Sequence, residues 1–262
     1  MITFSAIVPH SPLLIPEIGK ENSDSLNVTI AALKTLAGHF YAAQVETIVI
    51  ISPHGPINKK SFVFNFSPKF KGDFSEFGHF SEKNEYYGDN ELSYKIKSKI
   101  KSKFPIQLTT IEEFNYGLLV PLHYLLAHKK TTKILPISPA EELSINDHFR
   151  FGEAINDELL QSEKRIAVIA SFETSNKLSK TSPAGYEVGA KKFDEKLLKN
   201  LAEKNNNAVL KIKPEKLKKY GLDELNTLAL FLGIMSEKNY VPNILSYESP
   251  FGIGHAVIEY EL

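Results

Sequence analysis

Three short apolar runs of this sequence each end in a turn that carries a side chain able to bind a metal ion. His10 lies in VPHSPLLIP, His54 in SPHGP and Glu248 in SYESPFGIG. Two imidazoles and one carboxylate are the ligand set of a facial triad, which leaves about three coordination positions open on a non-haem ferrous ion. A small molecule and dioxygen can both bind at open positions, so these residues predict a metal centre suited to oxygen chemistry.

The elements that must position these ligands alternate between strand and helix patterns. Residues 2–8 and 47–51 are apolar runs bounded by proline and glycine, and residues 23–40 between them have a helical period. Three further apolar runs alternate with three helical stretches; the runs are residues 133–137, 165–170 and 243–247, and the stretches are residues 118–128, 147–160 and 186–204. This alternation predicts one α/β domain over residues 1–262, with a mostly parallel central sheet flanked by helices on both faces. Residues 254–260 are expected to add a strand near an edge.

Each candidate ligand falls just beyond the end of an expected strand. In open α/β sheets, ligands bind in the crevice at the carboxyl ends of the strands, where loops project side chains toward one point. A single histidine in such a turn is more often a structural residue than a ligand. The prolines around His10 and His54 fix the backbone after each strand, which favours the interpretation of His10, His54 and Glu248 as a set.

Composition narrows the classes of partner and metal. Lys plus Arg and Asp plus Glu balance at 31 each, so no global basic field exists for nucleic acid or an anionic membrane. Without cysteine, a metal must be held by nitrogen and oxygen donors, which suits iron, manganese or zinc. The N-terminal residues lack a basic region, and no apolar stretch approaches the roughly 18 residues of a membrane span. We therefore expect a cytoplasmic protein without a membrane or nucleic-acid partner.

Other kinds of site have little support in the sequence. It has no G-x-G-x-x-G after the first strand, no P-loop lysine motif and no G-x-S-x-G nucleophile elbow. Residues 62–80 are rich in phenylalanine and have little helical period. Two interpretations remain for that segment: packing in a core or lid, or an apolar wall beside a site for a flat substrate.

Six blocks of sequence, taken in order, resemble one known family. They are VPHSPLLIPEIG at residues 8–19, ISPHGP at 51–56, GDFSEFG at 72–78, GLLVPL at 117–122, SPAGY at 182–186 and YESPFGIGHAV at 247–257. Together they resemble the class III extradiol ring-cleavage dioxygenase catalytic (B) subunit superfamily, and within it the Memo-like branch. The resemblance implies an Fe(II) site with ligands at His10, His54 and Glu248, and a catechol-like substrate that is cleaved with dioxygen. It also implies a base and an acid that move protons during the reaction.

The sequence departs from the family pattern at two positions where that pattern has histidine. Here they are Tyr116, directly before GLLVPL, and Asn176, in the loop after the strand of residues 165–170. Asn does not titrate near neutral pH and a free Tyr has a pKa near 10, although both can hydrogen-bond a ligand. Losing general acid–base help typically costs about a hundred- to ten-thousand-fold in rate. His255 is the first candidate to compensate, followed by His79 and His123.

Three hypotheses therefore stand. The first is an Fe(II) dioxygenase acting on a catechol-like or other flat oxygenated molecule. The second is a Memo-like relative impaired in catalysis, which binds metal or has lost it and acts through interactions. The third is a different metal-assisted reaction, such as hydrolysis, at the same open site with Mn or Zn. For assembly we expect a homodimer, the commonest symmetric oligomer, or pairing with a small second subunit.

Overall fold

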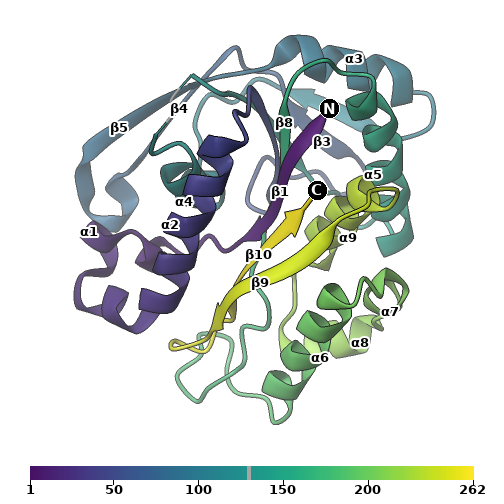
Figure 1. Ribbon diagram of the computed structural model, residues 1–262. Coiled ribbons are helices and arrows are strands. Elements are labelled where there is room, and N and C mark those ends of the chain that lie inside the picture. The colour runs from purple at the N-terminus through teal and green to yellow at the C-terminus, as the bar shows by residue number, and fades with distance from the viewer. Residues whose placement is uncertain (129–130) are drawn as a thin grey trace.

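A central sheet of eight strands organises the structure, a computed structural model that describes residues 1–128 and 131–262 (Figure 1). The inner strands have few polar residues and are buried on both faces, as expected for strands covered by helices on two sides. The strand order is β6-β3-β7-β2-β8-β1-β10-β9. The bounds are β1 Ile2–Val8, β2 Thr47–Ile51, β3 Phe62–Asn65, β6 Ile106–Thr109, β7 Lys133–Ser138, β8 Ile166–Ser171, β9 Val241–Glu248 and β10 His255–Glu261.

The middle of the sheet is parallel and its flanks are mixed. β2 pairs in parallel with β7 and β8, and β8 pairs in parallel with β1. β3 joins β7 antiparallel, and β10 joins both β1 and β9 antiparallel. The predicted α/β class and mostly parallel sheet are therefore confirmed. The last strand of the chain, β10, was expected near an edge; it is the second strand from that edge, because β9 pairs with its outer side.

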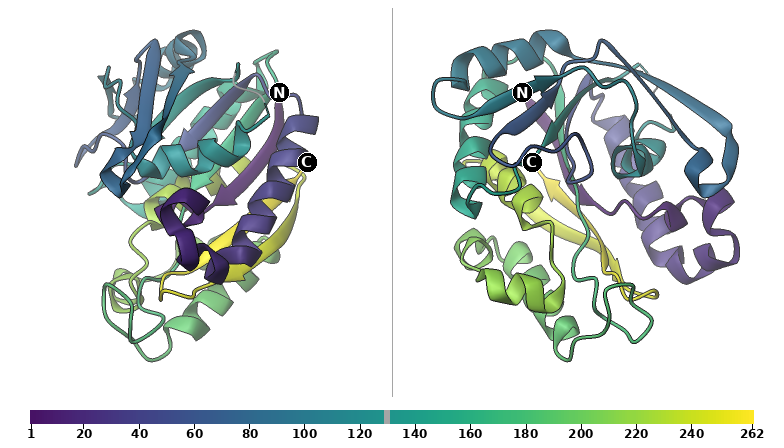
Figure 2. Two further views of the ribbon diagram at one scale, coloured as in Figure 1. Left: turned by 90° about the vertical axis from the view of Figure 1, so that its left-hand side faces the viewer. Right: turned by 180° about the vertical axis from the view of Figure 1, so that it is seen from behind.

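Helices cover both faces of the sheet, as Figure 2 shows. One core packs α3, α5, α6 and α9 against side chains such as Ile7, Val49 and Ile51, and the other packs α2 and α4 against Val8, Ile48 and Ile50. Successive strand residues thus point to opposite faces. The helix bounds are α1 Pro16–Gly19, α2 Asn27–Ala42, α3 Asn90–Ile100, α4 Tyr116–Leu125, α5 Ile145–Leu160, α6 Ala190–Ala202, α7 Asn206–Leu210, α8 Pro214–Tyr220 and α9 Leu225–Met235.

The phenylalanine-rich segment enters three elements. It runs through β3, then β4 (Lys69–Phe74), and reaches the start of β5 (His79–Tyr87), with β4 and β5 forming a separate antiparallel pair. Phe62, Phe64, Phe70 and Phe74 are buried in the two cores, whereas Phe80 is exposed. Phe77 lies between these groups and lines a cavity. The packing interpretation is confirmed for the buried rings, and Phe77 is the ring that lies where an apolar cavity wall would need one.

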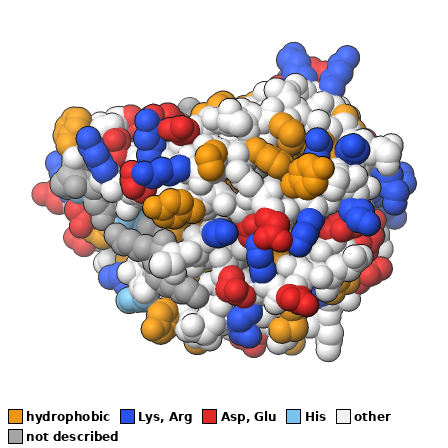
Figure 3. Space-filling view, turned by 90° about the horizontal axis from the view of Figure 1, so that it is seen from above, with side chains coloured by type: hydrophobic (Ala, Val, Ile, Leu, Met, Phe, Trp, Pro, Cys, Tyr) orange, Lys and Arg blue, Asp and Glu red, His pale blue; other side chains and the backbone are white. Residues whose placement is uncertain are grey.

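The surface agrees with the balanced charge. Figure 3 shows Lys and Arg interleaved with Asp and Glu across one face, without a large area of a single sign. Within the part of the chain that the structure describes, we find no helix long and apolar enough to cross a membrane.

Candidate metal centre

The two predicted histidines meet at one edge of the sheet. His10 follows β1 and His54 follows β2, and both strands flank β8 in parallel. Their carboxyl ends therefore open on the same side, and the two Nε2 atoms lie 2.9 Å apart. The rings meet edge to face, with centroids 4.6 Å apart. Two imidazole nitrogens that point at one spot are arranged as ligands of a common cation.

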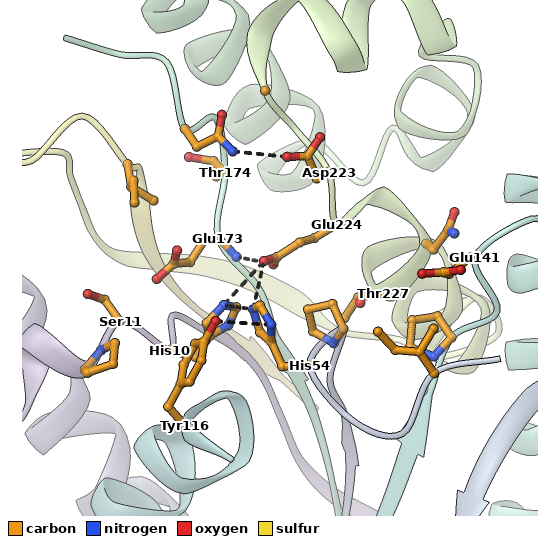
Figure 4. Close-up of a pocket in the computed structure, with 18 of the residues that line it drawn as sticks. His10, Ser11, His54, Tyr116, Glu141, Glu173, Thr174, Asp223, Glu224 and Thr227 are labelled. Atoms are coloured by element: carbon orange, nitrogen blue, oxygen red, sulfur yellow. Dashed lines mark hydrogen bonds and ion pairs between the residues drawn. The ribbon is translucent and has the colours of Figure 1, made fainter. Parts of the chain in front are cut away.

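A carboxylate that could serve as a third ligand reaches the same point from an unexpected segment. Glu224 directly precedes α9, and its Oε1 lies 3.3 Å from Nε2 of His10 and 3.8 Å from Nε2 of His54. Its Oε2 accepts a hydrogen bond of 2.7 Å from the backbone N–H of Glu173. Figure 4 shows the carboxylate directed at both rings. Ligand atoms of His10, His54 and Glu224 all lie within 4.8 Å of one another, so the donor set fits a divalent ion such as Fe(II).

Glu248, the carboxylate predicted as the third ligand, lies elsewhere, and the structure corrects that assignment. It is the last residue of β9, and its Oε1 accepts a 2.7 Å hydrogen bond from the backbone N–H of Thr29 in the first turn of α2. β9 runs in the same direction as β1, so Glu248 is at the expected end of the sheet. It is two strands from β1, about 10 Å at the usual strand spacing. Its carboxylate satisfies a helix N-terminus instead of meeting the imidazoles.

Hydrogen bonds orient both imidazoles. Ser171, at the end of β8, donates its hydroxyl proton to the backbone carbonyl of Gly117 at 2.5 Å. Its Oγ must then accept from Nδ1–H of His10, 3.0 Å away, which leaves Nε2 as the nitrogen that faces His54 and Glu224. The Tyr116 hydroxyl lies 3.3 Å from Nδ1 of His54 and can fix that ring in the same way.

The electrostatics of the cluster favour a positive charge between the ligands. Burial by itself would lower the pKa of His10, but the carboxylates of Glu224 and Glu173 outweigh it and raise this pKa to about 9. Burial and the charge on His10 lower the pKa of His54. Burial, opposed by His10 and reinforced by Glu224, raises the pKa of Glu173 to about 7. The partly buried carboxylates thus favour a positive charge at this point, which is the electrostatic condition for a metal site.

The three candidate ligands His10, His54 and Glu224 border a cavity of about 720 Å³. Its wall combines apolar side chains with polar groups, and a space of this size accommodates a small flat molecule. The apolar part of the wall is formed by Pro12, Pro53, Ile57, Phe77, Tyr116, Pro139, Ala140 and Ile253.

Comparison with known proteins identifies the family. The model of the catalytic LigB subunit of aromatic ring-opening dioxygenase matches residues 5–258. The chain belongs to this family. Protein CA_C1420 of Clostridium acetobutylicum is 27% identical over 265 residues, a match that covers 97% of this chain and 56% of that protein, so the chain spans about half the length of this relative. The uncharacterized protein JW3007 of Escherichia coli K12 shares the fold, with a TM-score of 0.68, 14% identity and coverage of 98% and 99% of the two chains.

Two of the predicted catalytic residues of this LigB-family chain line the cavity. Tyr116 is the first residue of α4, whose N-cap Asn115 accepts from the N–H of Gly117. Burial, reinforced by Glu173 and Glu224, raises the pKa of Tyr116, so its phenol keeps its proton at neutral pH. Asn176 donates through Nδ2 to Oδ2 of Asp223 at 3.1 Å.

The three histidines considered as compensators lie outside the lining of the cavity. His255 is 1% exposed in β10, and its Nε2 is 3.5 Å from Oε1 of Glu173. Burial, with a further contribution from His10, lowers the pKa of His255 to about 4. His123 packs against Phe74 in α4, and His79 opens β5. His255 is thus buried next to Glu173, which lines the cavity, and does not line the cavity itself.

Sequence reasoning missed Glu224 and Glu173. Glu224 follows no apolar strand run, which was the pattern used to find ligands. Its one sequence signal is its place before a long apolar helix, LNTLALFLGIM, where its carboxylate is available to project from the start of α9. Glu173 lies two residues after β8 and shares the strand-end signal of His10. The sequence pattern alone did not separate it from the neighbouring Ser and Thr.

Proposed function

We propose that this chain is a metal-dependent dioxygenase-type oxidoreductase that acts on a catechol-like or other flat oxygenated small molecule with dioxygen. Fe(II) would be held by His10, His54 and Glu224. The observation that carries the proposal is the convergence of two imidazole nitrogens and one carboxylate oxygen on the wall of a partly apolar cavity. Three ligands from three separate segments leave one side of the centre open for substrate.

The protein's own groups have definable tasks in this proposal. The bound metal would supply open coordination positions and Lewis acidity toward the substrate oxygens. Ser171 and Tyr116 keep the two imidazoles oriented, and the N–H of Glu173 holds Glu224 toward them. The rings of Phe77 and Tyr116, with centroids 5.7 Å apart, form an apolar wall against which a flat ring can pack.

A second candidate is a metal-binding or interaction protein of Memo-like character with impaired catalysis. A specific observation favours it: of the described residues that line the cavity, the only histidines are His10 and His54. Tyr116 with its raised pKa donates a hydrogen bond but does not act as a base at neutral pH, and Asn176 does not titrate. The same open site with Zn or Mn also suits a hydrolytic reaction, which is the third candidate.

The first test is metal binding by protein purified without oxygen. We expect about one Fe(II) per chain in the wild type, and loss of that iron in His54→Ala and Glu224→Ala. Glu248→Ala is the matched control, because its carboxylate serves α2 and should leave the metal content unchanged. Iron retained by Glu224→Ala but lost by Glu248→Ala would refute the proposed ligand set.

Once metal binding is established, an assay of catechol turnover distinguishes the three candidate functions. The dioxygenase proposal predicts that Fe(II)-loaded protein converts a catechol to a yellow ring-cleaved product in air. If the wild type binds iron and cleaves none of a broad catechol panel, the impaired or hydrolytic candidate gains. The double variant Tyr116→His/Asn176→His then provides a direct test of impairment. A gain of about a hundredfold or more in cleavage would show that only proton transfer had been lost.

A further inference from the structure

The cavity beside the proposed metal centre is lined by acidic side chains. Among its described lining residues there are four carboxylates and neither Lys nor Arg. Glu173 and Glu224 lie deep, with side chains 13% and 14% exposed, while Glu141 and Asp223 are exposed. Figure 4 shows all four around the same space. A molecule that enters must therefore pass carboxylates that have no basic side chain beside them in the wall.

The two exposed carboxylates, Asp223 and Glu141, form no ion pair with other residues in the described part of the chain. Asp223 accepts one hydrogen bond, from Nδ2 of Asn176, which is neutral. No ion pair involves Glu141 in the described residues, whereas the next residue, Glu142, pairs with Lys59 at 3.2 Å. Glu224 is directed at the imidazoles and is the carboxylate that would neutralise part of the metal charge. Asp223 and Glu141 thus remain available to a charge on the substrate.

An independent feature of the cavity indicates a ligand with a polar group. The hydroxyl of Thr227 belongs to a residue that is 0% exposed, lines the cavity and has no hydrogen-bond partner among the described residues. A buried hydroxyl without a partner favours a ligand that supplies one.

We propose that the substrate is a flat aromatic diol that carries an amine cation, and that catechols bearing a carboxylate are disfavoured. This inference rests on the proposed function, because the diol is assigned to the metal centre. The amine would lie toward Asp223 and Glu141, whereas a carboxylate in the same place would meet two like charges. In this proposal, the charge on the substituent of the substrate determines specificity, and the aromatic ring of the substrate does not.

The test compares three probes that share the diol and differ in charge. Dopamine is cationic, 4-methylcatechol is neutral and 3,4-dihydroxyphenylacetate is anionic. Their affinities are measured by calorimetry on Fe(II)-loaded protein without oxygen, so that binding is read without turnover. We expect dopamine to bind at least about tenfold more tightly than the anion, with the neutral probe between them, and the ratio to shrink at high salt.

Substitutions test whether Asp223 and Glu141 cause the difference in affinity between the cationic and anionic probes. Asp223→Asn/Glu141→Gln should reduce the ratio between dopamine and the anionic probe to below about threefold. Glu142→Gln is the matched control, because its carboxylate pairs with Lys59 and does not line the cavity, and it should keep the wild-type ratio. A ratio unchanged in the double variant, or tighter binding of the anionic probe by the wild type, would overturn the proposed amine preference.

The neutral probe separates this inference from the proposed function. If 4-methylcatechol binds and the charged probes bind equally well, the catechol site stands and the amine preference is refuted. If 4-methylcatechol does not bind to iron-loaded protein, the catechol function itself fails, and the amine preference fails with it.

Discussion

Gly152→Ala in α5 and Gly38→Ala in α2 should change the stability of the fold in opposite directions, because Gly152 lies where α5 crosses α9. A Cβ at Gly152 would lie 2.2 Å from the carbonyl oxygen of Leu230 and 2.9 Å from Cα of Gly233. These contacts are backbone atoms, which cannot turn aside as a flexible side chain can. Gly152→Ala must therefore push α9 away from α5. Overpacking of this kind costs about 1–3 kcal/mol or more, against a gain in helix propensity of about 0.5–1 kcal/mol.

Gly38→Ala in α2 is the control for the same chemical change. A Cβ at Gly38 meets nothing within 4 Å, so only the propensity gain applies, about 0.5–1 kcal/mol. At about 2–4 °C per kcal/mol for a chain of this size, Gly38→Ala should raise the melting temperature by about 1–4 °C. Gly152→Ala should lower it by several degrees, with the urea m-value unchanged. Equal stabilisation by both substitutions would refute the helix crossing.

Gly152→Ala should also affect the proposed metal centre. α9 begins directly after Glu224, so displacing α9 moves that carboxylate relative to His10 and His54. We expect Gly152→Ala to weaken metal binding by about 10–100-fold, the loss typical when a group that orients a ligand is removed. Gly38→Ala should bind metal as the wild type does. A metal titration of both variants below their melting temperatures checks this, and unchanged affinity in Gly152→Ala would contradict the link.

Three further outcomes are expected. Ser171→Ala removes the acceptor for Nδ1–H of His10 and should weaken metal binding about 10–100-fold in a metal titration, while Ser171→Thr retains most of the affinity. Burial alone would raise the pKa of Asp89, but hydrogen bonds from Thr47 and Lys164 outweigh burial and lower this pKa. The stability that the Asp89 carboxylate provides is therefore present at neutral pH and is lost as the pH falls through the lowered pKa. Asp89→Asn should therefore cost about 2–3 kcal/mol in urea unfolding at neutral pH. The difference from the wild type should begin to narrow near about pH 4 and close below the lowered pKa of Asp89. Free Fe(II) at a hundred times its Kd should add about 2.7 kcal/mol to the unfolding free energy, and a chelator should abolish the increase in a thermal melt.

The sequence was sufficient to predict six of the eight strands of the central sheet, and to place His10 and His54 just after strand ends, because both depend on local pattern. An apolar run of five to seven residues followed by a proline-bracketed turn predicts a strand end, and parallel neighbours bring their ends together. His10 and His54 meet for that reason. Which carboxylate meets the two imidazoles depends on strand order, which local pattern does not contain. Glu248 has the right local signal but lies two strands away from β1, whereas Glu224 has no strand before it.

The loop after β8 contacts the proposed metal ligands and also carries Asn176. β8 lies between β1 and β2, so the residues that follow it reach the whole centre: Ser171 orients His10, and the N–H of Glu173 holds Glu224. Fully buried Asp194 accepts the hydroxyls of the next two residues at 2.5 Å each and anchors the loop to α6. Asn176 follows on this anchored backbone. A histidine introduced at position 176 would therefore leave His10, His54 and Glu224 in place, so Asn176→His tests the proposed loss of proton transfer without disturbing the proposed ligands.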